Sequence, residues 1–185
     1  MASVFRRAGV PALAALAVLT GALVAVPEAS ADDAAVSLPT PRTMQDMVRM
    51  SAPDLTALYS ASPVASVPPA GQFVPGRAIK NPGSRTTVAN SRATRLVWQG
   101  KYFRDDGTMI NRVFGAGRAI PADVYVGESL LDGRPALILD YSRSRLWPEV
   151  RDEVREVSPG LYLGIMYKGK AQPEQKMFFT LDARR

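Results

Sequence analysis

Residues 124–141 read VYVGESLLDGRPALILDY, and this stretch decides the fold class. Its first part, residues 124–130, is rich in β-branched and aromatic residues, and its last part, residues 134–141, contains the apolar run Ala-Leu-Ile-Leu. Asp132-Gly133 between them is a turn dipeptide, because glycine tolerates the positive φ that tight turns need. We therefore predict an antiparallel β-hairpin here.

Similar segments lie on both sides of this hairpin. They are short, alternating or β-branched, and they are separated by Gly, Pro and Asp-Gly. They are residues 71–79, 95–104, 110–114, 161–167 and 176–181. About six to eight closely spaced strands with no strand–helix alternation predict a mainly β fold, an antiparallel sheet closed into a barrel.

The segment PEVRDEVREV, residues 148–157, fits two structures. Its three valines lie at helical spacing, and its proline suits a first helical turn. The Ser-Pro-Gly turn and the strand-like residues 161–167 that follow favour a second hairpin instead. We predict a strand, with an amphipathic helix as the alternative.

The N-terminal part of the chain predicts two short helices over residues 43–60. Residues 43–50 carry apolar residues at helical spacing, and Pro53 stands where a second helix begins. Leu55, Leu58 and Tyr59 share one face of that second helix. The Pro-, Ala- and Ser-rich residues that follow form a linker to the strands.

Residues 1–31 have the layout of a removable secretory signal peptide. Arg6 and Arg7 precede an uncharged Ala-, Leu- and Val-rich stretch, and Ala29-Ser30-Ala31 provides the small residues of a cleavage site. We predict cleavage after Ala31, so that the protein is exported to the cell envelope or secreted with no stable membrane span. A flexible lead, residues 32–42, and a single domain, residues 43–185, would then remain.

Two alternatives for this N-terminal segment stay open. The 19 uncharged residues 8–26 approach the roughly 20 that cross a bilayer, which would suit a retained anchor. The paired arginines also suit twin-arginine export in place of the general secretory route.

The absence of cysteine and histidine limits the chemistry of the chain. Disulfides, the usual zinc ligands and a Ser-His-Asp triad are all excluded. We expect no metal and no cofactor, and any chemistry must come from arginine, carboxylates and tyrosine. The net charge of +6 has no basic run interleaved with aromatics, so nucleic acid is not an expected partner. The oligomeric state stays open.

Three motifs carry a resemblance to known proteins. They are WQGKYF at residues 98–103, LDGRPALILDYS at residues 131–142 and RDEVREVSPGLYLG at residues 151–164. The chain resembles a group of uncharacterised bacterial and plant proteins that are distantly similar to GXWXG-type proteins. The resemblance spans most of residues 44–181. It implies a lipocalin-like antiparallel β-barrel and no particular reaction.

A lipocalin-like barrel suggests a small lipophilic or amphipathic ligand bound inside it. In an extended strand, Arg151, Glu153 and Arg155 share one face, and two cations around an anion suit an anionic head group. The residues expected to bind the ligand are Trp98, Lys101, Tyr141, Arg151, Arg155 and Tyr162. Ordinary surface salt bridges and core packing of the aromatic rings are the alternatives.

Two other functions remain as hypotheses. A carboxylate-based hydrolase or isomerase would use Asp140 with Glu153, or with Asp152, as an acid/base pair that converges in one cleft. A non-catalytic interaction protein of the cell envelope would have no cavity and a large exposed apolar patch. We expect binding in preference to catalysis.

Overall fold

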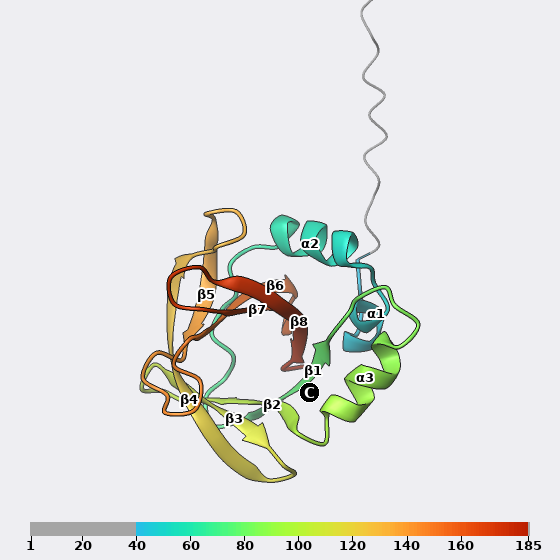
Figure 1. Ribbon diagram of the computed structural model, residues 1–185. Coiled ribbons are helices and arrows are strands. Elements are labelled where there is room, and N and C mark those ends of the chain that lie inside the picture. The colour runs from blue at the N-terminus through green and yellow to red at the C-terminus, as the bar shows by residue number, and fades with distance from the viewer. Residues whose placement is uncertain (1–39, 185) are drawn as a thin grey trace, which may run out of the picture. The chain divides into compact units, whose positions relative to one another are not determined.

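Eight antiparallel strands form a closed barrel in the computed structural model of the chain, which describes residues 40–184 (Figure 1). Each strand pairs with its neighbours in chain order, and the last pairs with the first. The strands are β1 (Phe73–Ile79), β2 (Trp98–Phe103), β3 (Thr108–Val113), β4 (Gly117–Glu128), β5 (Pro135–Asp140), β6 (Val150–Ser158), β7 (Leu161–Lys168) and β8 (Glu174–Asp182). The predicted antiparallel barrel is confirmed.

The expected signal peptide, residues 1–31, and most of the expected lead, residues 32–42, lie outside the described residues. Within residues 40–184, no helix is long and apolar enough to span a membrane.

The hairpin of β4 and β5 is present, with Tyr125 opposite Ile138. Its connection is longer than a two-residue turn at Asp132-Gly133, because the ladder already ends at the pair Glu128–Pro135. Residues 129–134 form a loop instead. Gly133 still adopts a left-handed φ of 70° within it. The loop is long because its side chains and amides bind β6, as described below.

The ambiguous segment 148–157 is a strand over most of its length. β6 pairs with β5 on one side and with β7 on the other. The helical spacing of its valines is therefore coincidental: Val150 and Val154 are buried in the barrel core.

The two predicted N-terminal helices are present as α1 (Met44–Val48) and α2 (Ala52–Ala61). Thr43 caps α1 in a reciprocal capping box with Asp46, and Ser51 caps α2 through the Asp54 amide. Pro53 lies in the first turn of α2. Both helices lie outside the barrel (Figure 1).

A third helix, α3 (Thr87–Thr94), was not predicted. Its sequence, TVANSRAT, has no apolar stripe, and its N-cap makes no side-chain hydrogen bond. Tertiary contact with β1 holds it in place, including a 3.1 Å hydrogen bond from Arg77 Nε to Ser91 Oγ. Local sequence alone does not specify such a helix.

The buried apolar residues form two clusters. One fills part of the barrel interior and includes Phe103, Leu137, Leu139 and Phe179. The other joins the apolar faces of α1 and α2 to the strands that they cover, and its members are Met47, Val48, Leu55, Leu58, Tyr59, Ile79, Leu161, Leu163, Ile165, Tyr167 and Phe178. The two helices therefore cover part of the outer surface of the barrel, and the interior remains available for a site.

Candidate functional site

The barrel encloses a cavity of about 460 Å³. Its walls are largely apolar and include Trp98, Met166, Met177 and Phe179. Four buried polar side chains also line it: Lys101, Asn111, Tyr141 and Asp152. Exposed residues line its entrance, namely Lys80, Val97, Trp147, Lys168 and Lys176. The cavity thus has a polar inner end, apolar walls and a cationic entrance.

A β-bulge in β2 brings two of the lining residues to the same side. Trp98 and Lys101 are three positions apart, so a regular strand would point them to opposite faces. The pairing of β2 with β3 shifts between Trp98 and Gly100, and Gly100 has a φ of 143°. An inserted residue at such a bulge re-aims the side chains that follow it. Trp98 and Lys101 consequently both line the cavity.

Lys101 is the centre of the polar inner end. Its Nζ donates hydrogen bonds to Tyr141 Oη at 2.7 Å, to Asp152 Oδ2 at 2.9 Å and to Asn111 Oδ1 at 3.0 Å. Its side chain is 2% exposed. The three acceptors match the three protons of an ammonium group, so the buried charge is fully paired.

The neighbours of Lys101 are bonded to one another. Tyr141 donates to Asp152 Oδ2 at 2.9 Å, and Trp98 Nε1 donates to Asn111 Oδ1 at 2.8 Å. Asn111 Nδ2 donates to the carbonyl of Ile120 at 2.9 Å. Among the described residues, no hydrogen bond uses Asp152 Oδ1. Asp152 therefore keeps an acceptor oxygen for a bound molecule.

Burial sets the protonation behaviour of this cluster. Removal from water lowers the pKa of Lys101, and the charge and hydrogen bond of Asp152 oppose that change. Burial, together with the Asp152 carboxylate, raises the pKa of Tyr141 well above its ordinary value. Tyr141 therefore remains a hydrogen-bond donor at neutral pH. The cluster is a fixed set of donors and acceptors without a free nucleophile, which suits orienting a polar group.

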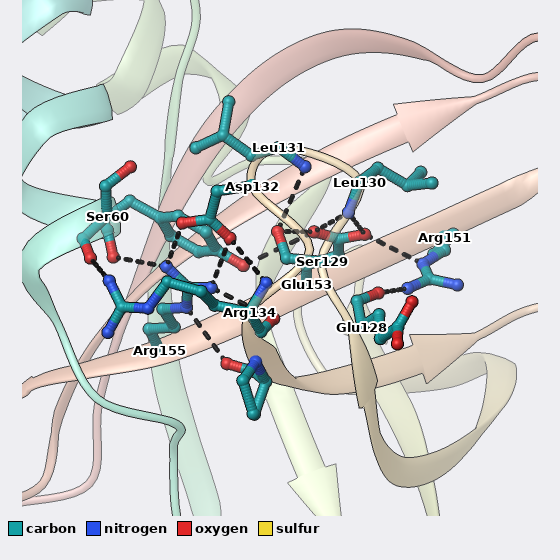
Figure 2. Close-up of polar contacts among 12 residues, drawn as sticks. Ser60, Glu128, Ser129, Leu130, Leu131, Asp132, Arg134, Arg151, Glu153 and Arg155 are labelled. Carbon is teal, nitrogen blue, oxygen red and sulfur yellow. Dashed lines mark hydrogen bonds and ion pairs between the residues drawn. The ribbon is translucent and has the colours of Figure 1, made fainter. Parts of the chain in front are cut away.

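A second polar cluster lies on the outer face of β6 and is shown in Figure 2. The Glu153 carboxylate accepts hydrogen bonds from Ser129 Oγ at 2.6 Å and from the Leu130 amide at 2.9 Å. Arg151 Nε donates to the same carboxylate at 3.0 Å. These bonds fix the start of the loop 129–134 against the barrel.

Arg155 fixes the rest of that loop. Its guanidinium pairs with both oxygens of Asp132, at 2.7 and 2.8 Å, in the bidentate geometry that suits arginine. It also donates to the carbonyls of Tyr59, Pro135 and Arg134 at 3.1 to 3.2 Å. The Arg155 guanidinium lowers the pKa of Asp132. Arg155 therefore ties α2 and the β4–β5 loop to β6.

Replacing Asp132 with asparagine is expected to lower the free energy of unfolding by about 2 kcal/mol, because hydrogen bonds to a buried charged group are lost. Asp123→Asn is the control, since its partner Arg143 is largely exposed and such pairs contribute at most about 1 kcal/mol. Urea denaturation measures both. Equal losses in the two variants would contradict the structural role of Arg155.

The predicted site residues separate into two groups. Trp98, Lys101 and Tyr141 line the cavity. Arg151 and Arg155, which were expected to hold a head group inside the barrel, lie on the outer face. Arg151 binds Glu153 and the Glu128 carbonyl at the end of β4, and Arg155 binds the loop 129–134. The reason is strand alternation, which turns Asp152 and Val154 inward and their neighbours outward.

Tyr162 belongs to the interior apolar cluster but does not line the cavity. Burial and the nearby Glu156 raise the pKa of Tyr162 to about 12.

The two carboxylates of the enzyme hypothesis have separate partners. Asp140 accepts from the Ser142 amide at 2.8 Å and from Tyr125 Oη at 3.3 Å. Glu153 is occupied by the loop 129–134, as described above. Neither residue lines the cavity. The structure therefore does not bring Asp140 and Glu153 together as an acid/base pair.

Sequence reasoning did not propose Asn111 or Trp147 as site residues, and it named Asp152 only as a possible partner in catalysis. Alternation along β6 provided a signal for Asp152, because it shares a face with apolar Val154. For Asn111 and Trp147, no local pattern in the sequence marked a place at the cavity.

The fold and the cavity define a small, closed antiparallel β-barrel with a polar cluster inside it. No family model matches the chain, and no curated protein matches it. The crystal structure of a protein from Thermomonospora curvata is similar, with a TM-score of 0.51 and 18% sequence identity. The match covers 77% of this chain and 94% of that chain. At this identity, the likeness shows the barrel fold alone.

Proposed function

We propose that the protein binds a small lipophilic or amphipathic ligand inside the barrel, as a lipocalin-like binding protein. The observation that carries this proposal is the 460 Å³ cavity with apolar walls and a paired Lys101–Asp152 cluster at its inner end. Small-molecule sites are typically cavities of roughly 300–1,000 Å³ with mostly apolar linings and a few placed polar groups. This cavity fits that description.

The polar cluster favours a ligand whose buried end is uncharged. Lys101 and Asp152 neutralise each other, so a second charge at the inner end would have no partner and would be costly to bury. A hydroxyl or amide group on the ligand could donate to Asp152 Oδ1. The apolar remainder would contact the rings of Trp98 and Phe179, which meet edge to face at 5.9 Å.

Export belongs to the same proposal. The arginine pair, apolar stretch and small residues of the first 31 positions support export from the cytoplasm. A barrel without cysteine is held by packing and hydrogen bonds, so it suits an oxidising compartment as well as a reducing one.

Binding of the neutral fluorescent probe N-phenyl-1-naphthylamine tests the proposal. We expect the probe to gain fluorescence with the wild-type protein and to bind Met177→Trp on the order of tenfold more weakly, because the larger ring fills the cavity. Val126→Trp on exposed β4 is the matched control and should bind as the wild type does. If Met177→Trp folds normally and binds the probe unchanged, the cavity is not the binding site.

A further inference from the structure

The entrance of the cavity is also the most distinctive surface of the barrel. Because the strands alternate in direction, the β1–β2, β3–β4, β5–β6 and β7–β8 connections leave the barrel at the same end. Residues from three of these connections, or directly beside them, line the entrance: Lys80, Val97, Trp147, Lys168 and Lys176. The other connections leave at the opposite end.

Exposed apolar side chains are concentrated at this end of the barrel. Of the ten large hydrophobic side chains that are exposed within residues 40–184, five lie in these connections. They are Leu96, Val97, Phe114, Leu146 and Trp147, with exposed fractions of 77, 49, 74, 68 and 40%. Phe114 lies beside Val97, because its amide donates to the Val97 carbonyl at 3.0 Å. A gathering of exposed apolar side chains at one end of a protein is typical of an interaction surface.

Cationic residues are concentrated at the same end. The four connections, residues 80–97, 114–116, 141–149 and 169–173, contain seven Lys or Arg residues and a single acidic residue, Glu149. The loops at the opposite end, residues 104–107, 129–134 and 159–160, contain two Arg and three Asp residues. The connections at the entrance end therefore carry more positive charge than the loops at the opposite end.

Acidic groups near the entrance cancel only part of this charge. Glu149 pairs with Lys168 at 3.1 Å, Glu174 pairs with Lys176 at 2.5 Å, and Asp123 pairs with Arg143. In the described part of the chain, the side chains of Lys80, Arg145 and Lys170 take part in no ion pair. Their charge remains available to an anionic partner.

We infer that this entrance rim docks on the surface of an anionic lipid bilayer. Apolar side chains on the tips of separate loops can enter the boundary between head groups and acyl chains, while lysine and arginine contact the lipid phosphates. Tryptophan is favoured at this boundary, and Trp147 both faces outward and lines the cavity. Docking would open the cavity directly onto the bilayer, which offers a route for a lipophilic molecule to pass between them.

The shape of the rim favours a bilayer over an acidic protein. A protein partner buries a continuous patch, whereas these apolar residues stand on separate loops around an opening. The inference concerns a surface and does not require the cavity to hold a ligand, so vesicle binding and probe binding can fail independently.

Flotation with lipid vesicles tests this inference. The wild-type protein and all variants are isolated from the natural host, so that all of them carry the same N-terminus. We expect binding to vesicles of phosphatidylcholine with phosphatidylglycerol to be stronger than binding to phosphatidylcholine alone, and to weaken as salt is raised.

Two triple variants separate the apolar and the charged contributions. Leu96→Ser/Phe114→Ser/Leu146→Ser should weaken binding to the anionic vesicles on the order of tenfold or more. Lys80→Gln/Arg145→Gln/Lys170→Gln should do the same, since each cation near an anionic surface contributes about a fivefold factor. The matched controls, from exposed positions away from the rim, are Val67→Ser/Val126→Ser/Leu130→Ser and Arg42→Gln/Arg104→Gln/Arg184→Gln.

The controls should bind as the wild type does, and all variants should unfold at the wild-type temperature because the positions are exposed. The inference is overturned if the wild type shows no preference for anionic vesicles, if either rim variant binds them unchanged, or if the control variants lose as much binding as the rim variants. Unchanged binding of N-phenyl-1-naphthylamine by the rim variants would show that ligand binding in the cavity and bilayer docking by the rim are separate functions.

Discussion

Asp152→Ala is expected to lower the free energy of unfolding by about 3–5 kcal/mol, because it leaves the charge of Lys101 buried without its ionic partner. The Lys101 side chain is 2% exposed, so solvent compensates little for the lost carboxylate. Tyr141 also loses the acceptor of its hydroxyl group. Urea denaturation at neutral pH measures the loss.

The loss should shrink as pH rises. Without Asp152, no carboxylate opposes the lowering of the Lys101 pKa by burial, so the folded state gives up this proton at a lower pH than the unfolded state, whose ordinary pKa is 10.5. Between the two values the unfolded state binds more protons, and stability therefore rises with pH. A deficit that is equally large just below pH 10.5 would contradict this explanation.

Two comparisons make the Asp152 result specific. Glu149→Ala removes the partner of Lys168, but both side chains are about half exposed, so the expected cost is at most about 1 kcal/mol. Replacing the pair together, as Lys101→Met with Asp152→Leu, should recover most of the stability, because no unpaired charge remains in the interior. If the double variant is no more stable than Asp152→Ala, lost packing and not the unpaired charge explains the result.

Gly100→Ala is expected to cost about 3–5 kcal/mol or to prevent folding, from strained backbone together with overpacking. A Cβ at this position would lie 2.1 Å from the Val74 carbonyl oxygen, and φ is 143°. The clashing atom belongs to the backbone of paired β1, so it cannot rotate away. Thermal or urea unfolding of the purified variant measures the effect.

Gly133→Ala is the control for Gly100. Gly133 also has a positive φ, of 70°, but no atom lies within 4 Å of the added Cβ. Its expected cost is about 1 kcal/mol, the typical penalty for a left-handed non-glycine residue. Similar losses of stability at both positions would contradict the explanation that position 100 must be glycine because β1 and β2 approach each other closely at the bulge.

The sequence was sufficient to predict the barrel because the signals for its strands and turns are local. The hairpin around Asp132-Gly133 and the strand-like segments follow from residue type, spacing and turn chemistry. The capping residues Thr43 and Ser51 also stand next to the helices they begin. Each of these features is decided by neighbours in the chain.

The candidate site was harder to predict because it depends on distant residues. Lys101 and its partner Asp152 are 51 positions apart, and the bulge at Gly100 turns Lys101 inward against the simple alternation of β2. The charge pattern of β6 suggested that Arg155 binds a ligand, yet its guanidinium donates hydrogen bonds to Asp132 and to three backbone carbonyls. Charge patterns alone do not distinguish a ligand anchor from a structural pair.

The most direct test of the central proposal is native mass spectrometry of the protein isolated from its natural host. We expect a mass that exceeds that of the chain by one small, largely apolar molecule, and we expect Met177→Trp, with its filled cavity, to lose that molecule. A folded wild-type protein that carries no bound molecule, or one that Met177→Trp retains fully, would contradict the proposal that the barrel is a binding protein.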